Sequence, residues 1–114
     1  MIRKKEECSV EIREAMKGGP GQAVQTSFAS KEELLNKARL FGNIHLEPNC
    51  GIGYHVHEGE SEIFYIANGE AIYNDNGVEK TVKAGDICIC KPGEGHSVTT
   101  SDTACDLVAL IVLQ

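Results

Sequence analysis

Residues 51–69 read GIGYHVHEGESEIFYIANG, and residues 84–96 read AGDICICKPGEGH. Both segments combine short alternating stretches with Gly and Pro residues, a pattern typical of strands joined by tight turns. Both also carry side chains that bind first-row metal ions, namely histidines and glutamates. The two segments therefore predict a metal site built on a β-rich fold.

The spacing of the histidines indicates how such a site is assembled. His55 and His57 are two residues apart in a stretch that alternates like a strand, so both imidazoles leave the same face. Glu62 opens the apolar run after a turn, and His96 opens another strand after the turn at 92–95. We expect these four side chains to bind one divalent metal ion. Three nitrogens and one carboxylate suit iron, manganese, nickel, copper and zinc alike, so the metal's identity stays open.

The two segments resemble the two conserved motifs of the cupin family. The first motif has two histidines one residue apart, then three or four residues, a glutamate, six residues and a glycine, and the sequence from His55 to Gly69 fits it. The second has a glycine, five residues, a proline, one residue, a glycine, two residues and a histidine, and Gly85, Gly93 and His96 keep its spacing. Both motifs occur in the expected order, which is far more specific than a lone pair of histidines.

The sequence departs from the cupin pattern at three positions. Lys91 stands where the family usually has proline, Thr100 where asparagine often closes the second motif, and Asn49 where glycine usually opens the first. None of these changes removes a ligand. The resemblance covers about residues 40–113 and implies an all-β, double-stranded β-helix (jelly-roll) barrel.

The resemblance also implies a function, though only broadly. In cupins, a metal held by three histidines and a glutamate keeps coordination places open for water, dioxygen or a substrate oxygen. This implies a metal-dependent enzyme acting on a small organic molecule, either an oxygenase or an isomerase or lyase. The alternative is a non-catalytic cupin module that binds a small ligand or a metal. A barrel that kept the four residues by descent without holding metal is a further possibility.

Other polar side chains compete for roles in the site. Glu58 and Glu60 are rival carboxylates on the turn before Glu62, but the motif spacing favours Glu62 and we expect the other two to form a solvated acidic rim. His45 fits neither motif and is expected to lie outside the site. The three tyrosines are expected to serve mainly in packing; they are Tyr54, Tyr65 and Tyr73.

The chain divides into an N-terminal arm, residues 1–29, and a barrel domain, residues 30–114. Ser30 and Glu33 fit a capping box ahead of an apolar pattern, which predicts one short helix before the barrel. From residue 39 onward the apolar residues alternate, as in strands. Asn76-Gly77 predicts a tight hairpin, because both residues tolerate positive φ.

Five cysteines without a CxxC pair are expected to be small buried hydrophobic residues in a reducing cytosol, and a redox or second-metal role is the alternative. They are Cys8, Cys50, Cys88, Cys90 and Cys105.

The length and the net charge of the chain limit the kinds of partner that we expect it to have. A chain of 114 residues is large enough for one core and one domain. Its net charge of −6 argues against nucleic acid as a partner. The longest apolar stretch, residues 107–113, is far too short to span a membrane, and the charged first residues do not resemble a signal peptide. We expect the protein to be cytoplasmic and to bind a small molecule. Small cupins commonly pair through edge strands and N-terminal arms, so the resemblance implies a homodimer with residues 1–29 contributing to the interface.

Overall fold

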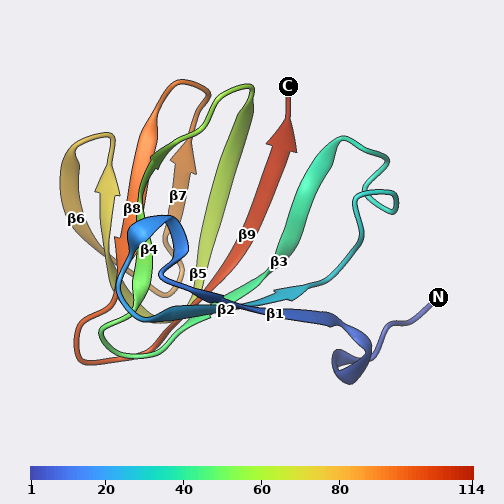
Figure 1. Ribbon diagram of the computed structural model, residues 1–114, viewed down its shortest axis with the longest axis horizontal. Helices are drawn as coiled ribbons and strands as arrows, with labels where there is room; N and C mark the ends of the chain where they lie inside the picture. The colour runs from blue at the N-terminus through green and yellow to red at the C-terminus, as the bar shows by residue number, and fades with distance from the viewer.

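The computed structural model describes all 114 residues and contains nine strands that form one continuous, curled sheet (Figure 1). Neighbouring strands follow the order β1-β2-β3-β9-β5-β8-β4, and β6 and β7 both pair with β5. All the pairings are antiparallel. The strands are β1 (Ser9–Glu14), β2 (Gln22–Ser27), β3 (Ala38–Leu46), β4 (Gly51–Val56), β5 (Glu60–Asp75), β6 (Val78–Lys83), β7 (Ile87–Cys90), β8 (Gly95–Thr99) and β9 (Cys105–Leu113).

The long strand β5 joins the two layers of the barrel. Its first half pairs with β7 and β9, and its second half pairs with β6 and β8. The register shifts between Ile66 and Asn68, just before Gly69, which adopts a φ of +78°. A Cβ at position 69 would collide with the carbonyl oxygen of Ala104, so only glycine fits where the first motif ends.

The core fills the space between the two layers. Buried and more exposed residues alternate along β3 and β9, as the period of two predicts, and Ile44, Leu46, Leu107 and Ala109 are almost fully buried. Phe64 of β5 is also buried. The predicted jelly-roll barrel is consistent with this architecture.

The predicted N-terminal helix is wrong. The capping box itself forms, because the backbone N–H of Ser30 donates to Glu33 Oε1 (2.9 Å) and the N–H of Glu33 donates to Ser30 Oγ (3.1 Å). Leu35 and Asn36 then adopt φ values of 58° and 57°, and the chain leaves the helical path after a single turn. One turn lacks the length that stabilises a helix, so only turns follow before β3. The helical elements are two 3₁₀ turns, at Lys5–Glu7 and Met16–Gly18.

The predicted hairpin at Asn76-Gly77 is confirmed. Asn76 and Gly77 have φ values of 51° and 105°, and Asp75 pairs with Val78 across the turn. The side chain of Asn74 also accepts a hydrogen bond from the N–H of Gly77 at 2.7 Å. This hairpin joins β5 to β6.

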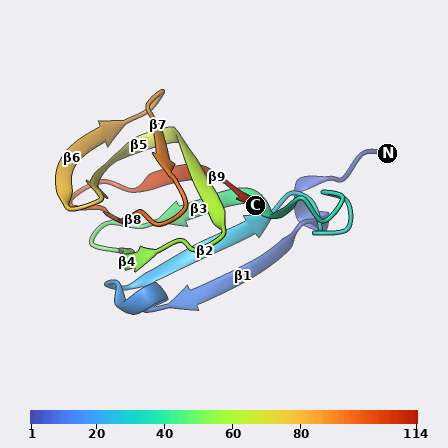
Figure 2. The ribbon, with the colours of Figure 1, turned by 90° about the horizontal axis from the view of Figure 1, so that it is seen from above.

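Residues 1–29 contribute two strands to the sheet. Strand β2 pairs with β3, and β1 lies beyond it at the edge, so Figure 2 shows the two strands as a ribbon along one side of the barrel. The turn between them, which contains Met16–Gly18, packs on β4. This contact brings the β1–β2 turn to the part of the barrel that carries the histidines.

All five cysteines are free thiols, and four of them are buried as predicted. Burial raises the pKa of Cys88, Cys90 and Cys105 to about 11. These thiols therefore stay protonated at neutral pH and pack as small apolar side chains. Cys8 is the partly exposed member of the set.

Candidate metal centre

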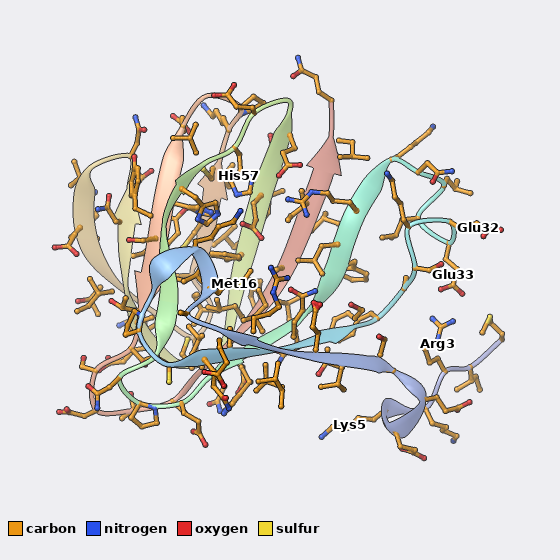
Figure 3. All side chains as sticks on the ribbon, in the orientation of Figure 1. Arg3, Lys5, Met16, Glu32, Glu33 and His57 are labelled. Atoms are coloured by element: carbon orange, nitrogen blue, oxygen red, sulfur yellow. The ribbon has the colours of Figure 1, made fainter.

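The structure brings together the four residues predicted from the two motifs. His55 lies in β4, His57 directly follows β4, Glu62 lies near the start of β5, and His96 lies in β8. One ligand atom from each residue lies within 4.8 Å of all the others. Figure 3 shows His57 inside the barrel, above Met16 of the β1–β2 turn.

Strand pairing explains why these positions converge. His55 pairs directly with His96 across the antiparallel strands β4 and β8. The backbone N–H of His57 donates to the carbonyl of Glu94 at 3.1 Å, and the N–H of Gly93 donates to the carbonyl of His57 at 2.7 Å. The turn that precedes His96 therefore holds the end of β4, and both motifs meet at one place.

The separations between the ligand atoms suit a common ion. His57 Nε2 lies 3.1 Å from His55 Nε2, 3.1 Å from His96 Nε2 and 3.0 Å from Glu62 Oε1. His96 Nε2 lies 3.2 Å from His55 Nε2 and 3.1 Å from Glu62 Oε1. Two ligands that each bind an ion at about 2.1 Å, at right angles to one another, are about 3.0 Å apart. The cluster can therefore hold one metal ion.

Hydrogen bonds on the far side of the imidazoles orient two of the histidines. His55 Nδ1 lies 2.8 Å from the carbonyl oxygen of Gly53, and His57 Nδ1 lies 2.6 Å from Glu60 Oε2. Both partners only accept, so Nδ1 of each ring carries a proton, and in the neutral form of the imidazole the lone pair lies on Nε2. Lone pairs and a carboxylate then face one another in a buried site, which requires a positive charge among them.

The third histidine is held by aromatic neighbours. His96 Nδ1 lies 2.8 Å from the Tyr73 hydroxyl, which can accept its proton and leave Nε2 free. The ring of His96 stacks on Phe64, with the ring centroids 5.2 Å apart and the planes 11° from parallel. Burial raises the pKa of Tyr73, so its hydroxyl stays protonated. Sequence reasoning assigned Tyr73 to packing and missed this contact with a candidate ligand.

The charges in the cluster are mutually stabilised. Burial alone would raise the pKa of the Glu62 carboxyl, but the contacts with the imidazoles of His57 and His96 outweigh burial and hold this pKa below its usual value. The contact with the Glu62 carboxylate raises the pKa of His57, and burial lowers the pKa of His55. Glu62 is therefore an ionised, buried carboxylate, the form that binds a cation.

The prediction that Glu60 belongs to a solvated rim is wrong. Its side chain is only 14% exposed, because Arg39 and His57 both bind its carboxylate. The hydrogen bond from Arg39 is the largest cause that lowers the pKa of Glu60, to about 2. Glu58, on the same turn, is exposed as predicted. A pattern of residues along one strand could not reveal Arg39, which lies on β3 and reaches Glu60 of β5 over the intervening strand β9.

A cavity of about 190 Å³ adjoins the cluster. Three basic side chains line it, and two of them come from the β1–β2 hairpin, a segment to which the sequence pattern assigned no site residue. The walls also include apolar side chains from β3, β4 and β9. The lining residues are Arg13, Met16, Lys17, Gln25, Arg39, Leu40, Ile52, His55, Val56, His57, Glu60, Glu62 and Ile111.

His45 lies outside the cluster, as expected. Its Nδ1 is 2.9 Å from Asp106 Oδ1, and its Nε2 is 3.3 Å from Glu47 Oε2. Tyr54 and Tyr65 are about half exposed and make no hydrogen bond to the four candidate ligands.

The structure contains no helix with the length and apolar character needed to cross a membrane.

Comparison with known proteins agrees with the fold and the motifs. The sequence model of the cupin domain family matches residues 42–113 of this chain. An oxalate-binding protein from Thermotoga maritima is 41% identical over 114 residues, which cover 99% of this chain and 94% of that protein. The crystal structure of a predicted oxalate decarboxylase from Thermotoga maritima superposes with a TM-score of 0.95 at 40% identity, covering 100% of both chains.

A more distant solved structure shares the architecture. An uncharacterised conserved protein with a double-stranded β-helix domain from Klebsiella pneumoniae has a TM-score of 0.69 and 28% identity, covering 84% of this chain and 78% of that one. The matches thus extend from the two motifs to the whole barrel. The chain belongs to the cupin family.

Proposed function

We propose that this cupin binds one divalent metal ion through His55, His57, Glu62 and His96, and that it binds a small carboxylate such as oxalate in the adjoining cavity. The observation that carries the metal site is the convergence of three imidazole Nε2 atoms and one carboxylate oxygen, with neighbouring atoms 3.0–3.2 Å apart. When bound, the metal would supply a Lewis acid that attracts a ligand oxygen.

The cavity lining supports an anionic ligand. Arg13 and Lys17 bring positive charges to the cavity that the candidate metal ligands also line, whereas the chain as a whole carries a net charge of −6. The charge of Arg39, which lines the same cavity, is offset by its ion pair with Glu60. Basic side chains and a metal ion together suit a small dicarboxylate, since each carboxylate can meet a cation. The name of the relative that is 41% identical, an oxalate-binding protein, points to the same ligand class.

The site favours binding over turnover. Glu60 and Glu62 are the carboxylates that line the cavity; Glu60 is held by Arg39 and His57, and Glu62 is a candidate metal ligand. No free carboxylate remains there to transfer a proton. A metal-dependent enzyme is the second candidate, as an oxygenase, an isomerase or a lyase, and the description of the Thermotoga structure as a predicted oxalate decarboxylase favours the lyase version.

Calorimetry with oxalate tests the proposal. Manganese-loaded protein should bind oxalate, and the metal-stripped protein and the His57→Ala variant should not. Succinate serves as a longer dicarboxylate for comparison. Equal oxalate binding with and without metal would contradict a metal-linked site. Release of carbon dioxide and formate from oxalate by the loaded protein would replace the binding role with a decarboxylase.

We also propose a cytoplasmic homodimer, with residues 1–29 contributing. Phe41, Leu110, Ile63 and Ile89 lie side by side across four neighbouring strands on the outer face of the sheet. An apolar row of this kind supports pairing of two copies, which would remove it from water. Light scattering should give the mass of a dimer, and Ile89→Lys should shift it toward the monomer. A monomeric native chain would contradict the proposal.

A further inference from the structure

We propose that Glu60 is a positioning residue. Arg39 holds the Glu60 carboxylate, and this carboxylate accepts a hydrogen bond from the Nδ1–H of His57 and thereby keeps His57 Nε2 turned toward the metal. This inference rests on the proposed metal site. It assigns a role to Glu60 and Arg39, neither of which is one of the four candidate metal ligands.

The first step of the argument is the contact between Glu60 and His57. Glu60 Oε2 lies 2.6 Å from His57 Nδ1, the shortest contact of the cluster. The two nitrogens of an imidazole point to different sides of the ring, so Glu60 meets the side that faces away from the other ligands. Glu60 therefore orients a ligand and is not itself a ligand. A carboxylate that accepts from Nδ1 also makes Nε2 a better electron donor.

The second step is how Glu60 is held. Arg39 Nε lies 2.8 Å from Glu60 Oε1, and Arg39 Nη2 lies 2.7 Å from Glu60 Oε2. Such a two-pronged pair fixes the plane of the carboxylate as well as its position. Arg39 thus holds the Glu60 carboxylate in the orientation in which it accepts the hydrogen bond from His57.

A purely structural role is the rival interpretation. Arg39 belongs to β3 and Glu60 to β5, so the ion pair also links the two strands on either side of β9. The Arg39 side chain is 47% exposed, and exposed ion pairs contribute little to stability. A purely structural pair would change the unfolding midpoint of the metal-free protein and leave zinc affinity unchanged. A positioning pair would change the zinc affinity itself.

The test measures zinc binding to the full chain by competition with a coloured chelator. The variants are Glu60→Ala and Arg39→Ala, and the matched control is Glu58→Ala, an exposed carboxylate on the same turn. We expect Glu60→Ala to weaken zinc binding about 10- to 100-fold and Arg39→Ala to weaken it less. Glu58→Ala should stay within about twofold of the native chain. In zinc-loaded protein, the Nδ1–H signal of His57 in nitrogen-proton NMR should be sharp natively and broadened by solvent exchange in Glu60→Ala.

The outcomes separate this role from the metal site as a whole. Native-like zinc affinity and an unchanged His57 signal in Glu60→Ala would overturn the positioning role and leave the metal site standing. A native chain that binds no zinc would overturn both. If Glu60→Ala does not fold, Glu60→Gln keeps the shape and removes the charge, and unchanged zinc affinity in Glu60→Gln and Arg39→Ala would equally overturn the inference.

Discussion

The hydroxyl of Tyr73 lies 2.8 Å from Nδ1 of His96, so a buried tyrosine of β5 supports a candidate ligand on β8. The contact crosses the paired strands, since Tyr73 is registered with Val98, two residues beyond His96. Position 73 therefore links the packing of the core to the geometry of the site.

Removing this hydroxyl should affect both stability and metal binding. Tyr73→Phe leaves His96 Nδ1 without its partner inside the core, which should cost about 1–3 kcal/mol of unfolding free energy. Zinc affinity should fall about tenfold, because the orientation of His96 is less restricted. Urea denaturation and chelator competition measure the two effects. Tyr65→Phe, on an exposed ring, is the control, and equal effects in the two variants would contradict the account.

The Thr100 hydroxyl should stabilise the loop before β4. Thr100 Oγ1 accepts a hydrogen bond from the N–H of Cys50 at 3.0 Å and lies 2.6 Å from the carbonyl oxygen of Glu47, to which it donates. Thr100→Val keeps the volume and loses both contacts, so it should lower the free energy of unfolding by about 1–3 kcal/mol. Urea denaturation measures this loss. Thr103→Val, at an exposed position, should be close to neutral, and a neutral Thr100→Val would show that the hydroxyl does not stabilise the loop.

The glycine that ends the first motif should not tolerate a side chain. Alanine at position 69 meets both a positive φ, which costs about 1–2 kcal/mol, and the carbonyl oxygen of Ala104, which adds about 1–3 kcal/mol of overpacking. Gly85 also has a positive φ but open space around it, so Gly85→Ala should show the first cost alone. Denaturation midpoints of the two variants provide the comparison. Equal losses would mean that the Ala104 contact is relieved at no cost.

The pair formed by His45 and Asp106 should give a distinct pH dependence. The hydrogen bond to Asp106 is the largest cause that raises the pKa of His45 above its usual value. A raised pKa means that this pair stabilises the folded state fully below pH of about 6.5 and loses that contribution as pH rises through the folded-state pKa. NMR titration of the His45 ring should give a midpoint above 6.5, and Asp106→Asn should lower it. A native midpoint at or below 6.5 would contradict the pairing.

Local sequence patterns predicted many of the strands, and the spacing of the two cupin motifs selected the four side chains that the structure brings together. The period of two placed His55 and His57 on one face, and the positive φ values at Asn76-Gly77 followed from their side chains. The helix predicted after Ser30 is absent, because one turn is enough to form the hydrogen bonds of a capping box. The direction of the backbone from Leu35 onward depends instead on where strand β3 begins. A local signal could not decide that path.

The residues that surround the ligands were harder to predict, because they depend on contacts between distant segments. Arg39 meets Glu60 from 21 positions away, and Arg13 and Lys17 reach the cavity only because the β1–β2 turn packs on β4. The position of Glu60, three residues after His57, was the one usable signal. It identifies a neighbour of the ligand set and cannot tell a supporting carboxylate from a solvated one.

Elemental analysis of untagged protein purified without chelators tests the central claim most directly. The native chain and the His45→Ala control should each carry about one divalent metal ion per chain, and His96→Ala should carry almost none, because ligand binding depends on the complete set. Metal-free native protein that also fails to take up added manganese, iron or zinc would contradict the metal site, as would undiminished metal content in His96→Ala.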